Sequence, residues 1–355
     1  MIRIALLWPW SFLYGLVLRL RHLLYDLNVL RSTQGALPTV VLGNLTVGGT
    51  GKTPLTELLV REMEQIIGPG AVGILSRGYG RRSKGFHWVD ALDHPIDVGD
   101  EPLMLRRKMP QVAVAVCEDR LKGLKQMLQE NPELRWVVCD DALQHRSLRP
   151  TISMLVLDST QPVVKDRLLP LGRLRDLPSR MGHFDAALVT RLEHHTEGAL
   201  ETALQESGWP LHRIHFGTFM HPMPLLSFPQ GTPAKNGTSD ASPSQRERIL
   251  AVAGIARPLR FMDRLSERFQ VVRREAFADH GTFSEKDIKR WRVIMDSDRL
   301  QALVTTEKDA TRLEGMNLEG LDIRYEPIEA QLIPQTPLQD WLKSQIKQHD
   351  NTSTP

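Results

Sequence analysis

The sequence predicts an α/β protein in which a parallel sheet is covered by helices, followed along the chain by a second, smaller α/β domain. Two observations lead to this prediction. Short β-branched apolar runs alternate with helical stretches, and a segment rich in Pro, Gly and Ser interrupts the alternation at 229–247. Strands that alternate with helices are typical of a parallel sheet buried on both faces. At roughly 100–200 residues per domain, the length also allows two such units.

The composition is that of a folded, reduced protein. Of the 355 residues, 45 are Lys or Arg and 42 are Asp or Glu, so the formal net charge is +3. This balance gives no reason to expect nucleic acid as a partner, and no obligate protein partner is expected. A hydrophobic content of 41% excludes a disordered chain and a polytopic membrane protein. Cys117 and Cys139 both lie in apolar runs, which favours a cytosolic chain without disulfides.

Residues 1–30 are expected to form an amphipathic helix that associates with a membrane surface. The uncharged run 4–18 has only 15 residues and contains Pro9 and Gly15, whereas a spanning helix needs about 20. Aromatic side chains typical of a headgroup boundary come first: Trp8, Trp10, Phe12 and Tyr14. At about 100° per residue, an apolar stripe follows on one face: Leu13, Leu16, Val17, Leu20, Leu23, Leu24 and Leu27. A helix packed on its own protein and a true spanning helix are the alternatives.

The first domain is expected over residues 31–228. Its predicted strands are Thr39–Leu42, Val72–Leu75, Val112–Val116, Trp136–Cys139, Ser153–Leu157 and Ala186–Val189, and its predicted helices include Pro54–Ile67 and Arg120–Glu130. Residues 229–247 lack apolar periodicity and are interpreted as a flexible linker or insertion. The second domain, 248–345, contains the predicted strands Ile249–Val252, Gln270–Arg273 and Ala302–Thr305, and residues 346–355 are expected to form a frayed tail.

A glycine-rich segment between the first strand and the first helix predicts a phosphate-binding loop. It reads Gly43-Asn44-Leu45-Thr46-Val47-Gly48-Gly49-Thr50-Gly51-Lys52-Thr53-Pro54. The glycines let backbone N–H groups surround phosphate oxygens at the positive end of a helix. Lys52 is expected to reach the β- and γ-phosphates and the Thr53 hydroxyl to bind Mg²⁺. The sequence therefore predicts a P-loop NTPase-like fold that binds a nucleotide and Mg²⁺. The predicted nucleotide site is formed by Thr46, Val47, Gly48, Gly49, Thr50, Gly51, Lys52 and Thr53.

An acid pair follows a neighbouring strand. Asp140 and Asp141 come directly after the apolar run 136–139. A P-loop usually has such a carboxylate at the end of an adjacent strand, where it holds Mg²⁺ directly or through water. A strand that simply enters a loop would have the same sequence pattern. The interpretation of the acid pair as a Mg²⁺ site therefore depends on the glycine-rich segment.

Further polar residues follow the other predicted strands, at the sheet edge where ligands bind. Arg77, Arg120 and Arg175 could each offer a planar fork to a phosphate group, although a solvated or structural arginine is the alternative for each. Asp100, in the turn Gly99-Asp100-Glu101-Pro102, could accept a proton from an attacking hydroxyl. In isolation such a residue would more often cap the next helix.

Together these motifs resemble the tetraacyldisaccharide 4′-kinase family, the lipid A 4′-kinases. The matching segments keep their order from the N-terminal helix to about residue 340: the loop at 43–54, Ser76-Arg77-Gly78-Tyr79-Gly80, Gly99-Asp100-Glu101-Pro102, Asp140-Asp141 with Gln144-His145, Leu169-Pro170 with Gly172 and Leu174-Arg175, Ala253-Gly254-Ile255-Ala256 with Pro258, Phe277 with Asp279-His280, and Thr306-Glu307-Lys308-Asp309. An ordered set of this kind is far more specific than the loop alone.

The resemblance implies an enzyme that transfers the γ-phosphate of ATP to the 4′-hydroxyl of a tetraacyldisaccharide 1-phosphate, the lipid A precursor. It places the enzyme at the cytoplasmic face of the bacterial inner membrane. It implies that Asp100 is the catalytic base, that His280 orients it, and that Lys52 and Asp141 complete the catalytic set. The remaining roles are also implied: Thr53, Asp140, Asp141 and Gln144 around the metal, and Arg77, Arg120 and Arg175 around substrate or ATP phosphates.

Two other functions compete with this interpretation. A membrane-associated P-loop ATPase switch would share the loop, but such proteins often carry an extra lysine where this chain has Val47. A non-catalytic lipid-binding module conflicts with the intact Lys52, Thr53 and acid pair.

Overall fold

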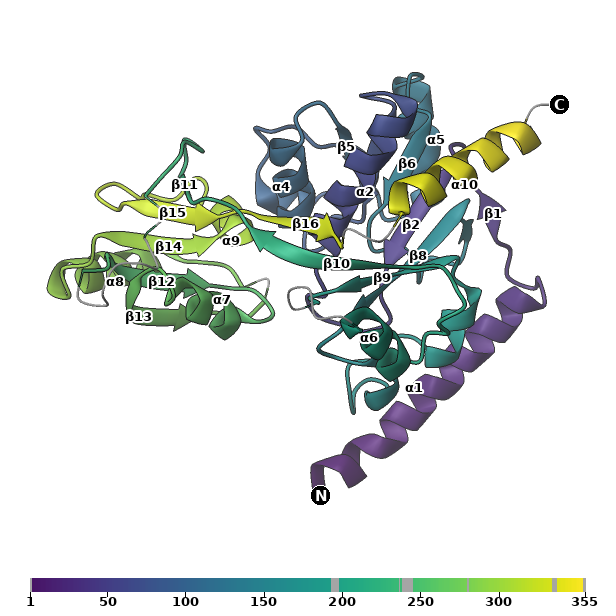
Figure 1. The fold of residues 1–355 in the computed structure, drawn as a ribbon, viewed down its shortest axis with the longest axis horizontal. Helices are drawn as coiled ribbons and strands as arrows, with labels where there is room; N and C mark the ends of the chain where they lie inside the picture. The colour runs from purple at the N-terminus through teal and green to yellow at the C-terminus, as the bar shows by residue number, and fades with distance from the viewer. Residues whose placement is uncertain are drawn as a thin grey trace.

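The computed structural model describes residues 2–192, 198–235, 237, 245–279, 281–333 and 337–353. Figure 1 shows two domains joined by a pair of long strands, with one long helix along the larger domain. The helices are α1 Ile2–Asp26, α2 Lys52–Ile67, α3 Pro95–Val98, α4 Asp100–Lys108, α5 Arg120–Glu130, α6 Ala199–Ser207, α7 Pro258–Leu265, α8 Glu285–Ser297, α9 Glu307–Arg312 and α10 Leu338–Ser353, with 3₁₀ turns η1 Val163–Lys165 and η2 Pro178–His183.

The strands of the larger, first domain form a nine-stranded sheet in the order β16-β10-β9-β8-β2-β6-β3-β5-β4. Their bounds are β2 Thr39–Gly43, β3 Val72–Ser76, β4 His87–Trp88, β5 Ala113–Val116, β6 Trp136–Cys139, β8 Ile152–Asp158, β9 Ala186–Thr190, β10 His215–Pro222 and β16 Ile328–Leu332. The seven inner strands run parallel, and only the edge strands β4 and β16 are antiparallel to their neighbours. Beside this sheet, β1 Thr33–Gln34 pairs with β7 Leu148–Arg149.

Both faces of this sheet are buried, as the alternating pattern predicts. Along β2, Val40 and Leu42 belong to the core beneath α2, α4 and α10, whereas Val41 joins the core beneath α5 on the other face. The predicted strands and helices of the first domain are all present within a residue or two. The prediction of a parallel sheet covered by helices is therefore confirmed.

The smaller, second domain contains a five-stranded sheet in the order β11-β15-β14-β12-β13. Its strands are β11 Leu226–Ser227, β12 Arg248–Ala253, β13 Gln270–Ala276, β14 Ala302–Thr306 and β15 Ile323–Glu326. Helices α7 and α8 cover opposite faces of the sheet, because Phe261 packs in one core and Trp291 in the other. Part of the predicted linker lies outside the described residues, namely 236 and 238–244. The rest of it is in contact with this domain: Glu247 accepts hydrogen bonds from Arg324.

The expected boundary of the second domain at 345 is wrong, and so is the frayed tail. After β15 the chain returns to the first domain, where β16 pairs with β10. Helix α10 then continues to Ser353. Leu338, Leu342 and Ile346, spaced four residues apart, are buried against the first domain, so packing holds the helix as far as Ile346.

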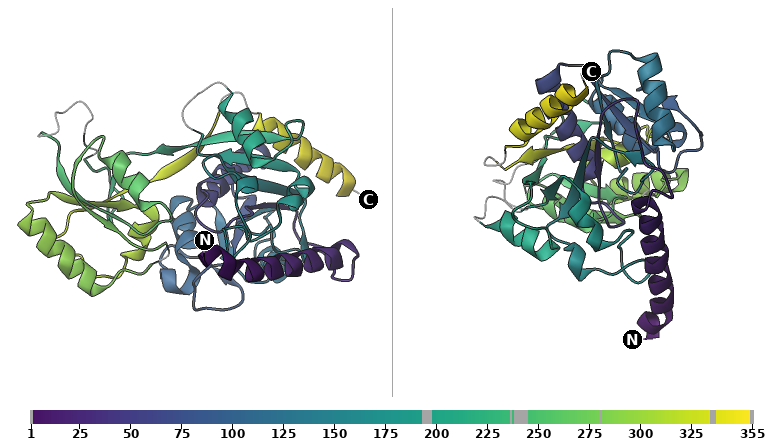
Figure 2. Two further views of the ribbon diagram at one scale, coloured as in Figure 1. Left: turned by 90° about the horizontal axis from the view of Figure 1, so that it is seen from below. Right: turned by 90° about the vertical axis from the view of Figure 1, so that its right-hand side faces the viewer.

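Helix α1 exists as predicted, but it faces the protein with its polar side. Ser11, Gly15, Leu18 and His22 are buried on the first domain. The apolar side is open to solvent, with about half or more of each side chain exposed for Trp8, Trp10, Phe12, Leu13, Leu16, Val17, Leu20, Leu23 and Leu27. The N-terminal part of α1 extends beyond the body of the molecule (Figure 2). A helix packed on the protein by its apolar stripe is therefore excluded.

Within the described residues, every helix is either too short or too polar to cross a bilayer.

Candidate active site

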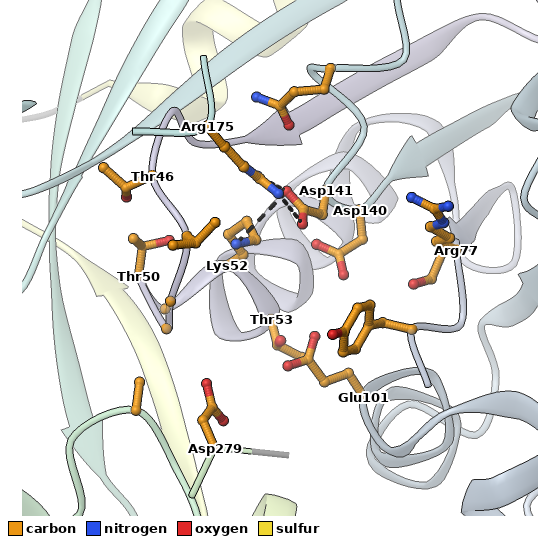
Figure 3. A pocket seen from close by; sticks show the side chains of 18 of the residues that line it. Thr46, Thr50, Lys52, Thr53, Arg77, Glu101, Asp140, Asp141, Arg175 and Asp279 are labelled. Atoms are coloured by element: carbon orange, nitrogen blue, oxygen red, sulfur yellow. Dashed lines mark hydrogen bonds and ion pairs between the residues drawn. The ribbon is translucent and has the colours of Figure 1, made fainter. Parts of the chain in front are cut away.

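A cavity of about 830 Å³ lies at the carboxyl ends of the parallel strands, between the two domains. Every residue that the sequence predicted for the site lines this cavity, apart from His280, which lies outside the described residues: Thr46, Val47, Gly48, Gly49, Thr50, Gly51, Lys52, Thr53, Arg77, Asp100, Arg120, Asp140, Asp141, Gln144 and Arg175. Figure 3 shows several of these side chains converging on the loop before α2. The second domain adds Ile255, Ala256, Asp279 and Lys308.

The glycine-rich loop has the backbone conformation that phosphate binding requires. Gly48 and Gly51 have φ angles of 106° and 82°, in the region that favours glycine. A Cβ atom added to Gly48 would meet no atom within 4 Å, so the loop borders open space there. Helix α2 begins immediately afterwards at Lys52, and its N-terminus directs unpaired N–H groups and a positive dipole at the cavity. These are features of a loop that binds phosphate groups.

Two cations and an amide hold the loop against the acid pair. Lys52 Nζ donates to Asn44 Oδ1 at 3.2 Å and lies 3.8 Å from Asp141 Oδ1. Arg175 binds Asp141 through both Nη atoms and donates to Asn44 Oδ1 at 2.6 Å (Figure 3 draws the Arg175–Asp141 and Lys52–Asp141 contacts). Burial would raise the pKa of Asp141, but Lys52 and Arg175 outweigh it, so the pKa of this carboxyl is lowered. Asp141 is thus a charged carboxylate beside the loop.

Asp140 differs from its neighbour because it is almost fully buried. It accepts a hydrogen bond from the Thr56 hydroxyl of α2 at 3.2 Å. Burial, with Glu101 and Asp141 nearby, raises the pKa of Asp140 to about 7. A bound divalent cation would favour its ionised form.

The cavity contains further oxygen atoms suited to Mg²⁺. Gln144 donates from Nε2 to the carbonyl of Asn44 at 2.9 Å, while its Oε1 is buried and meets no hydrogen-bond donor within the described part of the chain. The same holds for the hydroxyl of Thr50. Carboxylate, amide and hydroxyl oxygens are the ligands that Mg²⁺ prefers, usually together with water and nucleotide phosphates. The residues present therefore fit the predicted cation.

Asp100 is the first residue of α4 and is only 8% exposed. Its Oδ2 accepts two hydrogen bonds from Arg312 of α9, from Nε at 2.9 Å and from Nη2 at 2.6 Å. One turn earlier on α9, Lys308 contacts Glu101 at 2.8 Å. The second domain thus contacts both carboxylates at the start of α4.

Sequence reasoning assigned no role to Arg312 or Lys308. The pattern Thr306-x-x-Asp309 marks the start of a helix, and the spacing of four residues between Lys308 and Arg312 places both on one side of it. That spacing was the available signal, but it does not say which carboxylates the two cations meet.

Two of the three arginines predicted to bind phosphate, Arg120 and Arg77, differ in their surroundings. Arg120 is buried and donates to the carbonyls of Cys117 and Asp140, at 2.7 and 3.3 Å, so it connects the ends of β5 and β6. Burial lowers the pKa of Arg120. The exposed side chain of Arg77 lines the cavity and has no hydrogen-bond or ion-pair partner among the described residues; Figure 3 shows it at the right-hand side of the site. A phosphate contact therefore stays a prediction for all three arginines, with Arg77 the least engaged.

Helix α1 reaches the edge of this cavity. The Tyr14 hydroxyl donates to the carbonyl of Arg175 at 2.8 Å, and Arg21 donates to the carbonyl of Gln144 at 2.7 Å. Further along, His22 pairs with the buried Asp176 at 2.7 Å. Arg175 and Gln144 therefore contact both the amphipathic helix and Asn44 of the nucleotide loop.

A glycine-rich loop between strand and helix, an acid pair on the adjacent strand and a carboxylate on a third element define a P-loop phosphotransferase site. Comparison with known proteins makes the class specific. A family model described as Tetraacyldisaccharide-1-P 4′-kinase matches residues 3–347, and the chain belongs to that family.

Relatives and a solved structure agree with this assignment. The tetraacyldisaccharide 4′-kinase of Parabacteroides distasonis is 34% identical over 319 residues, which cover 88% of this chain and 84% of the relative. That of Porphyromonas gingivalis is 34% identical over 314 residues, with coverages of 86% and 85%. A crystal structure of LpxK from Aquifex aeolicus in complex with ATP, titled an "apo" form, is 27% identical with a TM-score of 0.72 and covers 98% of this chain and 99% of its own.

Proposed function

We propose that this protein is an ATP-dependent kinase that transfers the γ-phosphate of ATP to the 4′-hydroxyl of a tetraacyldisaccharide 1-phosphate, a precursor of lipid A. The observation that carries the proposal is the meeting of the P-loop and Asp100 in one cavity. Lys52 starts α2 and Asp100 starts α4, and both line the space between the domains. A phosphate donor and an acceptor hydroxyl can thus be held together, as phosphoryl transfer requires.

Each group of residues at the site has a separate role in the proposed reaction. Backbone N–H groups of the loop and Lys52 bind the phosphates. Asp100 accepts the proton of the attacking hydroxyl, and Arg312 fixes the direction of its carboxylate. Thr53, Asp140, Asp141 and Gln144 would hold Mg²⁺, which supplies charge neutralisation on the phosphates when it is bound. The family resemblance adds one further role to the proposal: His280 orients Asp100.

The membrane role of α1 is the second part of the proposal. A substrate with four acyl chains stays in the bilayer, so the enzyme must work at that surface. The exposed apolar face of α1, flanked by Trp8 and Trp10, is what an in-plane interfacial helix presents to lipid. We place the protein at the cytoplasmic face of the inner membrane, where ATP is available, as a peripheral or monotopic protein.

A labelling experiment tests the function. ATP labelled at the γ-phosphate is incubated with the protein and a tetraacyldisaccharide 1-phosphate in mixed micelles, beside a sample without lipid. The proposal predicts label in the lipid at the 4′ position. Rapid release of labelled phosphate with no labelled lipid would instead favour the membrane-associated ATPase switch.

A further inference from the structure

Three charged residues meet where α2, α4 and α9 come together, next to the phosphate cavity. The ammonium of Lys108 lies 3.0 Å from Glu57 Oε2 and 3.1 Å from Glu307 Oε2, and it donates to the carbonyl of Ile328 at 2.7 Å. Glu57 is only 2% exposed. None of these residues belongs to the catalytic set proposed above.

The cluster joins the helices whose first residues face the cavity. Glu57 lies on α2, which begins at Lys52, and Lys108 is the last residue of α4, which begins at Asp100. Glu307 is the first residue of α9, the helix of the second domain that also carries Arg312. Ile328 opens β16, one of the two strands that connect the domains.

We propose that Lys108 is a positioning residue that fixes the second domain and the Asp100 helix against the phosphate-binding helix. One ammonium contacts groups from all these elements, so its loss would free the far end of α4 and the start of α9 together. Transfer between bound groups depends steeply on their separation, and a shift of about 1 Å can cost 100-fold in rate. Lys108 would thus affect the kinase reaction without touching the substrates. The role of Lys108 rests on the proposed function only because lipid phosphorylation is the activity measured.

The charges of the cluster support this role. Burial lowers the pKa of Lys108, but Glu307 and Glu57 outweigh it, and the pKa is raised. Burial raises the pKa of Glu57 to about 7 and also raises that of Glu307. The charged groups that face Glu57 are Lys108, Glu307 and Arg61 of its own helix. Since Glu57 Oε1 is buried without a donor among the described residues, its ionisation depends mainly on Lys108.

The main test is Glu307→Ala, which removes the contact to the second domain but keeps the Lys108–Glu57 pair. We expect kcat for lipid phosphorylation to fall at least tenfold, with KM for ATP within twofold of the wild type, because the loop and Lys52 are untouched. Glu307→Gln should restore kcat to within about threefold, since its amide oxygen can accept the same hydrogen bond.

The matched control is Glu314→Ala. Glu314 pairs with Arg107, the neighbour of Lys108, in a more exposed contact between the same two domains. Its loss should leave kcat within twofold. Equal losses in both alanine variants would overturn the special role of the buried cluster, and so would an unchanged kcat in Glu307→Ala measured well below its melting temperature.

A second variant covers the case in which Glu307→Ala does not fold. The triple change E57Q/K108M/E307Q removes all three charges together and leaves no unpaired buried charge. We expect the same loss of kcat with ATP binding retained. Wild-type kcat in this variant would contradict the proposal, whereas absence of lipid phosphorylation by the wild-type protein would contradict the kinase function instead.

Discussion

Arg312, on the second domain, donates two hydrogen bonds to one oxygen of Asp100 on the first. The same guanidinium also donates to Asp309 and to the carbonyl of Gly254, each at 2.8 Å. These two contacts within the second domain fix the orientation of the guanidinium plane. The orientation of the proposed base therefore depends on how the two domains meet. His280, assigned this task from the family resemblance, lies outside the described residues.

Arg312→Lys tests that dependence. A lysine keeps the positive charge but cannot make all four hydrogen bonds at once. We expect kcat to fall by about tenfold to 100-fold with little change in KM for ATP. Arg292→Lys is the control, because Arg292 binds two carbonyls within the second domain, away from the cavity. If kcat of Arg312→Lys equals that of the control, Arg312 does not orient the base.

Asp100→Asn should remove the proton acceptor while keeping the shape of the side chain. Lipid phosphorylation should fall by about 10²- to 10⁴-fold, the range for loss of general base catalysis. Affinity for ATP, measured by calorimetry, should stay within a few-fold, because Asp100 belongs to α4 and the phosphate-binding loop keeps its own sequence. Asp97→Asn, an exposed carboxylate in the preceding helix, serves as the control. Near-normal turnover of Asp100→Asn would remove Asp100 from the role of base.

Polar substitutions on the free face of α1 should separate membrane binding from folding. Leu16 and Leu20 are 52% and 55% exposed, so the double change to Glu costs little in the folded protein. Each buried leucine gains roughly 1.5–3 kcal/mol from leaving water, so partition into phospholipid vesicles should fall at least tenfold. The melting temperature should not change.

Val293→Glu is the control for α1. Val293 is 66% exposed on α8 of the second domain, far along the chain from α1. Its variant should partition as the wild type does. Unchanged partition of the α1 variant would contradict the assignment of this helix to the membrane surface.

The stability of the ligand-free protein should depend on the proton of Asp140. Its folded pKa is about 7, above the ordinary value of 3.8, so the folded state holds a proton that the unfolded state releases between these values. Stability from this group is therefore present at low pH and lost as the pH rises toward 7, by at most about 1.4 kcal/mol per pH unit. The check is the urea midpoint from pH 5 to 8, compared with Asp140→Asn.

Asp140→Asn should show a flatter pH profile than the wild type, because its side chain cannot ionise. Other buried acids, such as Glu57, contribute to both proteins and cancel in the comparison. Parallel profiles for the two proteins would show that Asp140 is ionised throughout.

The sequence was informative where the deciding interactions are local. The glycine-rich loop and the run 136–141 each lie between recognisable elements, and parallel strands bring their carboxyl ends to one edge. For that reason the local patterns are enough to place Lys52 and Asp141 in one site, whereas the role of Asp100 came from the family resemblance.

Contacts between distant segments could not be predicted in this way. The amphipathic pattern of α1 indicated its two faces but not which of them meets the protein, and the polar face does. Arg312 reaches Asp100 across a domain interface, and β16 returns to the first sheet more than 100 residues after β10. Such pairings depend on tertiary packing, which no local periodicity encodes.

A single-turnover experiment tests the central claim most directly. Protein is loaded with γ-labelled ATP and Mg²⁺, and then mixed with lipid substrate and a large excess of unlabelled ATP. If one cavity holds both the triphosphate and the acceptor, the bound label appears in the 4′-phosphate of the lipid in a single fast phase, and Asp100→Asn slows that phase. Label that is released as free phosphate, or washed out by unlabelled ATP before reaching the lipid at saturating substrate, would contradict the account.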